Sequence, residues 1–459
     1  MRSLVVLIII FGSVPFILRR SSIGIIMWSW IAYMAPHRLT WGIAYDMPVA
    51  MIVGSAAIVS WMISREKKPI PLCSVSVLMI VLILWCGVTT IFAINPPHAF
   101  YQWQQFSKII LMTLITLSVM RNDEYLKQLI WITTLSIGFY TVKGGLFTII
   151  TGGNYQVWGP PDTFIYDNNQ LALATLMIIP LMNYLAGTAQ NWWIKWGLHG
   201  AMLLSLASAV GSYSRGALLG IGAVSLVLWL RSRRKLAFGI GGVLVAVCGL
   251  SLAPQKWWDR MNTIETYEVD ASANQRFEVW KEARLIAANR PVFGGGFGVF
   301  DDQATWERFG SGLDKPRNVH SIYFEMLGTQ GYFGLAIFLA LGASGFLTCR
   351  KTRRLARSNP ELNQYRDLAL MLECSLCAFA VSGTFLNLST FDLYYNLLTM
   401  VVINHVLAVG KLRSKMAENL PNSVAPVTYV RGPPAQAKTA MPRSFLRAKA
   451  RLDGRGTNR

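Results

Sequence analysis

A histidine and an arginine stand where a long polar loop meets an apolar stretch, at residues 316–328. A bilayer disfavours charge, so the titratable groups Arg317 and His320 at this boundary are candidates for function. A lone histidine there can also be a simple interfacial or helix-capping residue. Two further arginines, Arg215 and Arg276, are predicted on the same side of the membrane. Clustered positive charge lowers the pKa of an imidazole, which would leave His320 neutral and able to accept a proton near pH 7.

Arg215 is the only Lys, Arg, Asp or Glu between Lys195 and Arg231, with apolar sequence on both sides. We expect it at the tip of a helical hairpin near the membrane surface. An arginine in this place can reach the lipid headgroups with its long side chain. Its neighbours Ser214 and Gly216 favour a second interpretation, because a hydroxyl, a fork-shaped donor and a close-approach glycine together suit phosphate oxygens.

The loop at 151–169 is rich in turn-forming and aromatic residues. It leads into a predicted helix that Asp167 or Asn168 is suited to cap, with Asn169 following. Aromatic and amide side chains together suit a sugar, but they equally suit the aromatic belt of a membrane protein. The sequence leaves both interpretations open.

Residues 272–288, which include Arg276, predict an amphipathic helix lying over the mouth of the membrane segment. At helical spacing, one stripe holds Phe277, Trp280, Ala283 or Arg284, and Ala287. A glycine-rich turn follows at 291–298. It can be a phosphate cradle or a flexible connection, and it lacks the ending of a nucleotide-binding loop.

The rest of the chain positions the loops and helix ends that carry these candidate residues. It has the composition of a polytopic membrane protein. Of its residues 53% are hydrophobic and 14% are charged, where a soluble domain has about 25% charged residues. Apolar runs predict an all-α protein of twelve or thirteen transmembrane helices. The runs are 3–18, 22–36, 47–63, 72–93, 104–120, 126–150, 168–187, 192–212, 215–230, 236–253, 319–349, 367–388 and 392–409.

Four regions follow from this pattern. Residues 1–253 form the N-terminal transmembrane helices, 254–317 a large loop, 318–410 the C-terminal helices, and 411–459 a basic tail. Short basic loops at 65–68, 231–235 and 350–366 fall on one side with the tail, which assigns that side to the cytoplasm and the large loop to the periplasm. The tail holds eleven Lys and Arg against two acidic residues of a chain with net charge +20. We expect it to be disordered and drawn to anionic lipids rather than to nucleic acid.

Six cysteines all fall within or at the ends of apolar segments, without histidines at ligand spacing. Cys374 and Cys377 form a lone CxxC inside a predicted span. A redox or metal site there is less consistent with this setting than ordinary packing.

The motifs, in their order along the chain, resemble a family of bacterial inner-membrane enzymes: the O-antigen ligases, O-antigen polymerases and pilin O-oligosaccharyltransferases. The motifs are Ser214-Arg215-Gly216, Arg276 with Trp280, and residues 319–334 around His320. The tryptophan-rich segment at 28–42 and Asp167-Asn168-Asn169 are more narrowly similar to the O-glycosylation ligases associated with exosortase A. One departure stands out: these proteins usually carry glutamate where this chain has Thr329.

The resemblance implies a GT-C-like ligase fold and transfer of a glycan from undecaprenyl pyrophosphate to an acceptor hydroxyl of a lipid, glycan or protein. No cofactor and no metal are expected, with His320 as the base and Arg215 and Arg276 holding the pyrophosphate. A chain polymerase shares this donor chemistry and stays open. A transporter would place charges near the midplane and show an inverted repeat, which the sequence lacks. Substrate contacts are expected from Ser214, Trp280, Arg317, Asn318, Tyr323, Asp167, Asn168 and Asn169.

Overall fold

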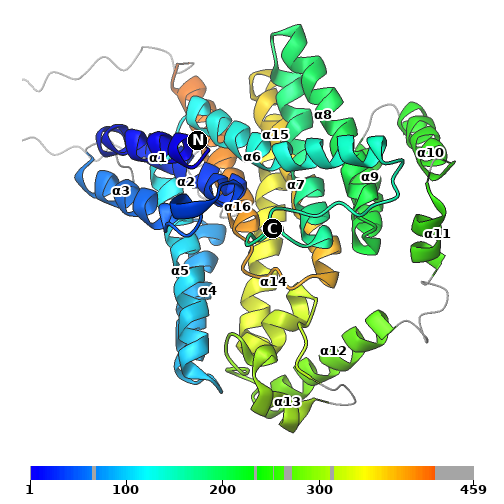
Figure 1. Cartoon of the computed structure of the whole chain (residues 1–459). Helices are drawn as coiled ribbons and strands as arrows, with labels where there is room; N and C mark the ends of the chain where they lie inside the picture. Colours follow the sequence, from blue (N-terminus) through cyan, green and yellow to red (C-terminus); the bar gives the residue numbers. More distant parts are fainter. Residues whose placement is uncertain are drawn as a thin grey trace, which may run out of the picture. The chain divides into compact units, whose positions relative to one another are not determined.

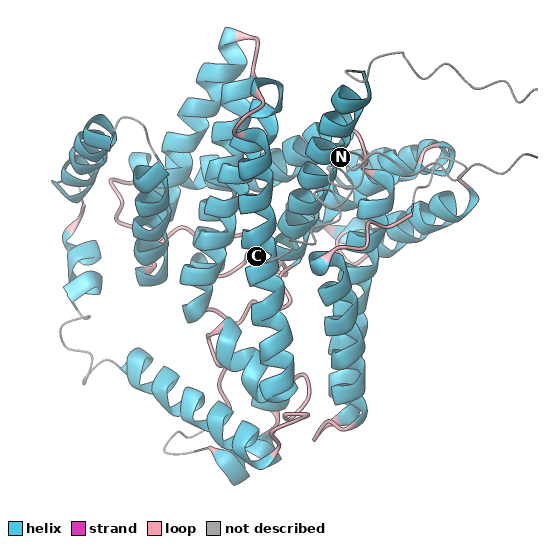
Figure 2. Cartoon of the chain, turned by 180° about the vertical axis from the view of Figure 1, so that it is seen from behind, coloured by secondary structure: helices cyan, strands magenta, loops and turns pink. Residues whose placement is uncertain are grey.

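The computed structural model describes residues 2–64, 69–231, 235–251, 253–262, 271–310 and 315–418. Regular structure in these ranges is entirely helical, as predicted (Figure 1 and Figure 2). The α-helices are α1 (Arg2–Arg19), α2 (Ser21–Met34), α3 (Val49–Ile63), α4 (Ser74–Ile91), α5 (Pro96–Val119), α6 (Asp123–Ile150), α7 (Asn168–Thr188), α8 (Trp192–Gly211), α9 (Arg215–Arg231), α10 (Lys235–Ser251), α11 (Gln255–Asn262), α12 (Ala271–Asn289), α13 (Gln303–Phe309), α14 (Ile322–Ala356), α15 (Asn363–Ser382) and α16 (Asp392–Glu418). Short 3-10 helices are η1 (Pro36–Leu39), η2 (Gly42–Ala44), η3 (Val299–Asp301), η4 (Pro360–Leu362) and η5 (Gly383–Phe385).

Seven helical segments in the described ranges are long and apolar enough to cross a membrane. They are α1, α4, α6, α7, α14, the segment Pro360–Phe385 around α15, and most of α16. The helices α2, α3 and α9 are apolar but shorter. The 14 residues of α2 rise only about 21 Å, less than the roughly 30 Å of a bilayer core. The count of seven is therefore below the twelve or thirteen that the sequence predicted.

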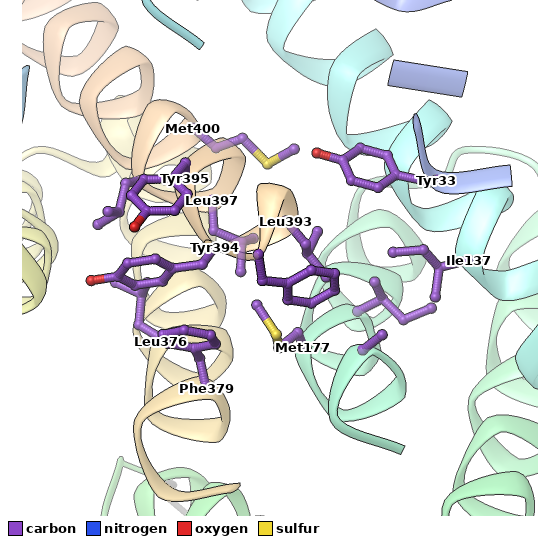
Figure 3. Close-up of a cluster of buried hydrophobic side chains, with 14 of the residues drawn as sticks. Tyr33, Ile137, Met177, Leu376, Phe379, Leu393, Tyr394, Tyr395, Leu397 and Met400 are labelled. Atoms are coloured by element: carbon purple, nitrogen blue, oxygen red, sulfur yellow. The ribbon is translucent and has the colours of Figure 1, made fainter. Parts of the chain in front are cut away.

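Residues Met1–Leu412 form one compact unit, and a second unit begins at Arg413. The core of the first unit is built around α16, whose side chains pack against α15 and α7 (Figure 3). Tyr394 of α16 stacks on Phe379 of α15, with ring centroids 4.1 Å apart and an interplanar angle of 13°. Tyr395, the next residue, is fully buried. This core fixes the helices whose ends carry the candidate site.

The long helix α14 is broken at Gly331, whose backbone lies in a left-handed region (φ 70°, ψ −175°). The break frees backbone groups that membrane depth requires to be paired. Residues of the glycine-rich turn supply the partners: the Gly295 N–H donates to the Gly328 carbonyl, and the Gly296 N–H to the Thr329 carbonyl, each at 2.8 Å. The glycine-rich turn is therefore a structural clamp on α14. The alternative prediction, that this turn binds phosphate through its backbone amides, is wrong for Gly295 and Gly296, because both N–H groups are bonded to α14.

Helix α12 confirms the predicted helix at 272–288, and it packs along α14 with α13 nearby (Figure 1). Its buried stripe differs from the predicted one. Of the predicted stripe, Ala283 and Ala287 are buried but Phe277 is 53% exposed, and Val279 and Ile286 are buried in addition, because the helix packs against α14. The predicted basic segments at 65–68 and 232–234, and the tail from 419 onward, lie outside the described residues.

Candidate functional site

The corner between α8 and α9 holds Arg215 at the first position of α9. Ser214 precedes the helix, and its hydroxyl oxygen accepts the Ala217 N–H at 3.2 Å. Tyr213 has a positive φ of 59° and donates its hydroxyl to the Gly153 carbonyl at 2.5 Å. These bonds fix the direction in which Arg215 leaves the corner. Ser214, predicted as a substrate contact, is buried and caps the helix.

The start of α7 is tied to the same corner. Asp167 caps the helix as predicted, because its side chain accepts the Asn169 N–H at 2.9 Å. The Asn168 amide donates to the Ser212 carbonyl at 2.6 Å, inside the protein. Asn168 therefore holds α7 against the α8–α9 corner. Asn169, whose amide donates to the Asp167 and Asn168 side chains, lines a neighbouring cavity.

Three arginines line one small cavity beside this corner. Arg215 enters it from α9, Arg260 from α11 and Arg276 from α12, with Asn169 on the same wall. Guanidinium groups stay charged at any physiological pH and match phosphate oxygens with paired donors. The cavity has the chemistry of an anion site, and its volume of about 30 Å³ accommodates one or two waters.

Arg260 was not predicted from the sequence. Trp257 and Met261, four positions apart on α11, pack on Tyr213 and so bring Arg260 to the cavity. The apolar spacing of this pair was the available signal, and it was too short to stand out in a polar loop.

Arg276 also lines a second cavity of about 90 Å³, together with His320, Arg317 and Asn318. The two cavities thus share one arginine. Its positive charge also acts on the imidazole of His320. The other two residues predicted as catalytic, Arg215 and His320, line one cavity each, and Arg276 belongs to both.

His320 is held in an unusual backbone conformation. Its φ is 44°, in the left-handed region that costs an L-residue about 1–2 kcal/mol. The neighbouring Val319 carbonyl accepts the indole N–H of Trp280 at 2.9 Å. The Trp280 ring also stacks on Phe324 of α14, with ring centroids 4.9 Å apart. Trp280, predicted to contact substrate, here holds the turn that carries His320.

The electrostatics around His320 favour the neutral imidazole. Burial lowers its pKa below the ordinary value, and the positive charge of Arg276 lowers the pKa further. The carboxylate of Asp167 acts in the opposite direction and raises the pKa. A neutral imidazole with a carboxylate nearby is suited to accept a proton and to tolerate the charge that results.

The remaining predicted contacts divide between the cavity and the interior. Arg317 and Asn318 are exposed and line the His320 cavity. Tyr323 donates its hydroxyl to the Ala380 carbonyl of α15 at 2.8 Å, so its hydroxyl serves helix packing. Thr329, at the position where the resemblance expects glutamate, is buried and donates to the Glu325 carbonyl at 2.6 Å.

Glu282 on α12 is a buried acid that the sequence did not point to. Its side chain is fully buried, and neither carboxyl oxygen has a hydrogen-bond partner in the structure. Burial raises its pKa to about 7. The carboxyl is therefore partly protonated at neutral pH in the same helix that carries Arg276.

Two family models match the chain. Residues 1–190 match a family of unknown function (DUF5935), and residues 200–339 match the O-antigen ligase family. A search of the curated proteins found no match. Arg215, Arg276 and His320 fall inside the ligase match, and Asp167 falls in the other. The chain is therefore a multi-pass membrane enzyme with an O-antigen ligase domain, a domain that implies transfer of a lipid-linked glycan to an acceptor.

Proposed function

We propose that this enzyme transfers a glycan from undecaprenyl pyrophosphate to an acceptor hydroxyl, at the periplasmic face of the inner membrane and without a metal ion. The observation that carries the proposal is the position of Arg276, which lines both the arginine cavity and the His320 cavity. In this proposal the leaving diphosphate binds in the arginine cavity and the base His320 lies in the other cavity, with Arg276 in contact with both.

In the proposed reaction the acceptor oxygen forms a bond to the anomeric carbon as the bond from that carbon to the diphosphate oxygen breaks. The acceptor proton passes to His320. The diphosphate departs with the electron pair, and Arg215 and Arg276 stabilise its negative charge. A single displacement of this kind inverts the anomeric configuration. Arg260 adds a third positive group to the same cavity.

The acceptor decides between a ligase and a chain polymerase, because both use the same donor. We also propose that the protein has a GT-C-like fold and that it is most similar to the ligases associated with exosortase A. Sequencing the glycosylated product in reconstituted membranes identifies the acceptor as lipid, protein or growing glycan.

Transfer from a lipid-linked donor in proteoliposomes tests the roles of the residues. We expect His320→Ala to lower kcat by about 10²- to 10⁴-fold, the usual contribution of general-base catalysis. Turnover of His320→Ala at the wild-type rate would refute its role as base.

A matched pair of variants on α12 tests the arginine cavity. Arg276→Lys keeps the charge but loses the paired donors, so we expect a loss of kcat/KM of about tenfold or more. Arg284→Lys changes an exposed arginine on the same helix and is expected to leave kcat/KM within about twofold. Equal effects of the two changes would contradict the assignment of Arg276. The same comparison applies to Arg215→Lys, where unchanged turnover would favour an arginine that only reaches the headgroups.

A further inference from the structure

The loop between α6 and α7 has a fixed conformation. The Gly159 N–H donates to the Tyr166 carbonyl at 2.8 Å, which closes residues 159–166 into a compact turn. The Val157 N–H donates to the Gly211 carbonyl at 3.1 Å, at the end of α8. Val157 and Ile165 are both buried. The loop is thus anchored by its own backbone and by two inward apolar side chains.

Two aromatic rings on this loop are left half-exposed. Trp158 is 51% and Tyr166 is 49% exposed. Their ring centroids lie 5.8 Å apart, with an angle of 46° between the planes. The loop is already anchored by other residues, so this pair forms a surface that its fold does not require.

Charged groups indicate that this part of the loop lies outside the hydrocarbon core of a bilayer. Asp162 accepts a hydrogen bond from the Tyr45 hydroxyl at 2.5 Å and lies 3.6 Å from the Arg38 guanidinium. Its side chain is nevertheless 58% exposed. Asp46, a second carboxylate paired with Arg38, is 89% exposed. Carboxylates this exposed are not compatible with the hydrocarbon core of a bilayer, so this part of the loop lies outside that core.

The aromatic pair is also adjacent to the candidate site. Tyr166 directly precedes Asp167, whose charge acts on His320. Two residues further on, Asn169 lines the cavity of Arg215. A molecule that reaches both cavities therefore passes close to the start of α7 and to the ring of Tyr166.

We propose that Trp158 and Tyr166 form a sugar-binding platform, with a pyranose ring of the glycan substrate lying on the aromatic surface and Asp162 accepting its hydroxyl groups. The inference rests on the proposed function and extends it by naming where the glycan is held. Pyranose rings have an apolar face of C–H groups and an edge of hydroxyls, and exposed aromatic rings on the same turn as a carboxylate match both. The glycan of the donor and that of an acceptor share this chemistry.

The experiment uses the full-length protein in lipid nanodiscs, with a water-soluble glycan released by mild acid from the lipid-linked pool of the source cells as the probe. Binding is measured by calorimetry in the His320→Ala background, so that turnover plays no part. We expect Trp158→Ala to weaken binding about tenfold, as the loss of one aromatic contact predicts. Trp158→Leu keeps an apolar side chain but no flat ring, and is expected to bind as poorly as the alanine variant. Trp158→Phe is expected to recover most of the affinity.

Trp192→Ala is the matched control. Trp192 is similarly exposed, at 58%, but begins α8, whose 20 residues separate it by about 30 Å from the end that contacts the loop. If Trp158 were instead part of the aromatic belt at the membrane surface, replacing it by leucine would leave sugar binding unchanged. Wild-type affinity in Trp158→Leu, or equal effects of Trp158→Ala and Trp192→Ala, would overturn the platform.

Kinetics with the active enzyme distinguish the two sources of the sugar. A higher KM for the lipid-linked donor in Trp158→Leu assigns the platform to the donor glycan, and a higher KM for the acceptor assigns it to the acceptor. If the wild-type enzyme transfers glycan while neither KM nor probe affinity changes, the platform alone is wrong. If the wild-type enzyme neither transfers glycan nor binds the probe, the proposed function fails as well.

Discussion

Replacing Trp280 by phenylalanine separates positioning of His320 from contact with substrate. The change removes the indole N–H that bonds the Val319 carbonyl at 2.9 Å but keeps an aromatic ring against Phe324. Such a bond contributes about 1 kcal/mol, comparable with the roughly 1–2 kcal/mol cost of the left-handed backbone at His320. Without the bond, a large share of molecules leaves that conformation. We expect kcat to fall about fivefold, the factor that corresponds to 1 kcal/mol.

Trp280→Ala gives the larger effect. It also removes the stacking and the partly buried ring, a loss toward the lower end of the about 3–5 kcal/mol found for a fully buried aromatic side chain. We expect kcat to fall by more than about a hundredfold. Leu285→Ala, at a partly exposed position of the same helix, is the control and is expected to stay near wild type.

The assay is steady-state transfer in proteoliposomes, with kcat and the KM of each substrate measured separately. A positioning residue lowers kcat and leaves KM nearly unchanged. If Trp280→Phe instead raises the KM of one substrate at constant kcat, the indole contacts that substrate. Wild-type kinetics in both variants would show that the hydrogen bond to Val319 has no part in holding His320.

Three further predictions concern charge. Activity needs neutral His320 and is lost as pH falls through the pKa of this residue. Arg276→Gln removes a positive charge that lowers this pKa, so the acid limb of the pH–rate profile should move to higher pH. Asp167→Asn removes a negative charge that raises the pKa, so the acid limb should move to lower pH. Shifts in the same direction would contradict this electrostatic account. The native pKa of Glu282, about 7, lies above the value near 4.5 expected when unfolded; stability present below pH 4.5 is therefore lost as pH rises through 7, by about 3 kcal/mol in full. Glu282→Gln should raise Tm at pH 8 and leave it nearly unchanged at pH 5, and a variant that follows the wild-type pH dependence would sink this interpretation. EDTA should leave transfer unchanged, whereas inhibition reversed by added Mg²⁺ would exclude the metal-free proposal.

Local signals in the sequence were sufficient where local chemistry decides the structure. The cap at Asp167 depends on one side chain and the next two amides, and it could be predicted without the fold. The helix that carries Arg276 follows from periodicity alone. The start of α9 at Arg215 follows from the single charge between two apolar runs.

Features set by distant partners were not predictable in the same way. The break at Gly331 depends on the Gly295 and Gly296 amides of the clamp, more than thirty residues away along the chain. The buried face of α12 depends on α14, so the predicted stripe included the exposed Phe277 and did not include the buried Glu282. The described residues hold seven candidate spans, fewer than the twelve or thirteen predicted, in part because apolar composition does not fix helix length: α2 and α3 are apolar yet short.

The clamp attaches the C-terminal end of α12 to the break in α14 at Gly331, so a change in the angle of α12 at this point displaces the other end of the helix. The C-terminal end of α12 leads directly into the clamp, and Arg276 lies thirteen residues away from that end, about 20 Å along the helix. A tilt of only about 6° over this length moves the guanidinium by about 2 Å. Cavities of about 30 and 90 Å³ are smaller than the roughly 300 Å³ or more of a typical ligand site, so a ligand of ordinary size would have to widen them. Because Arg276 lines both cavities, a rotation at Gly331 of this size would change both of them together.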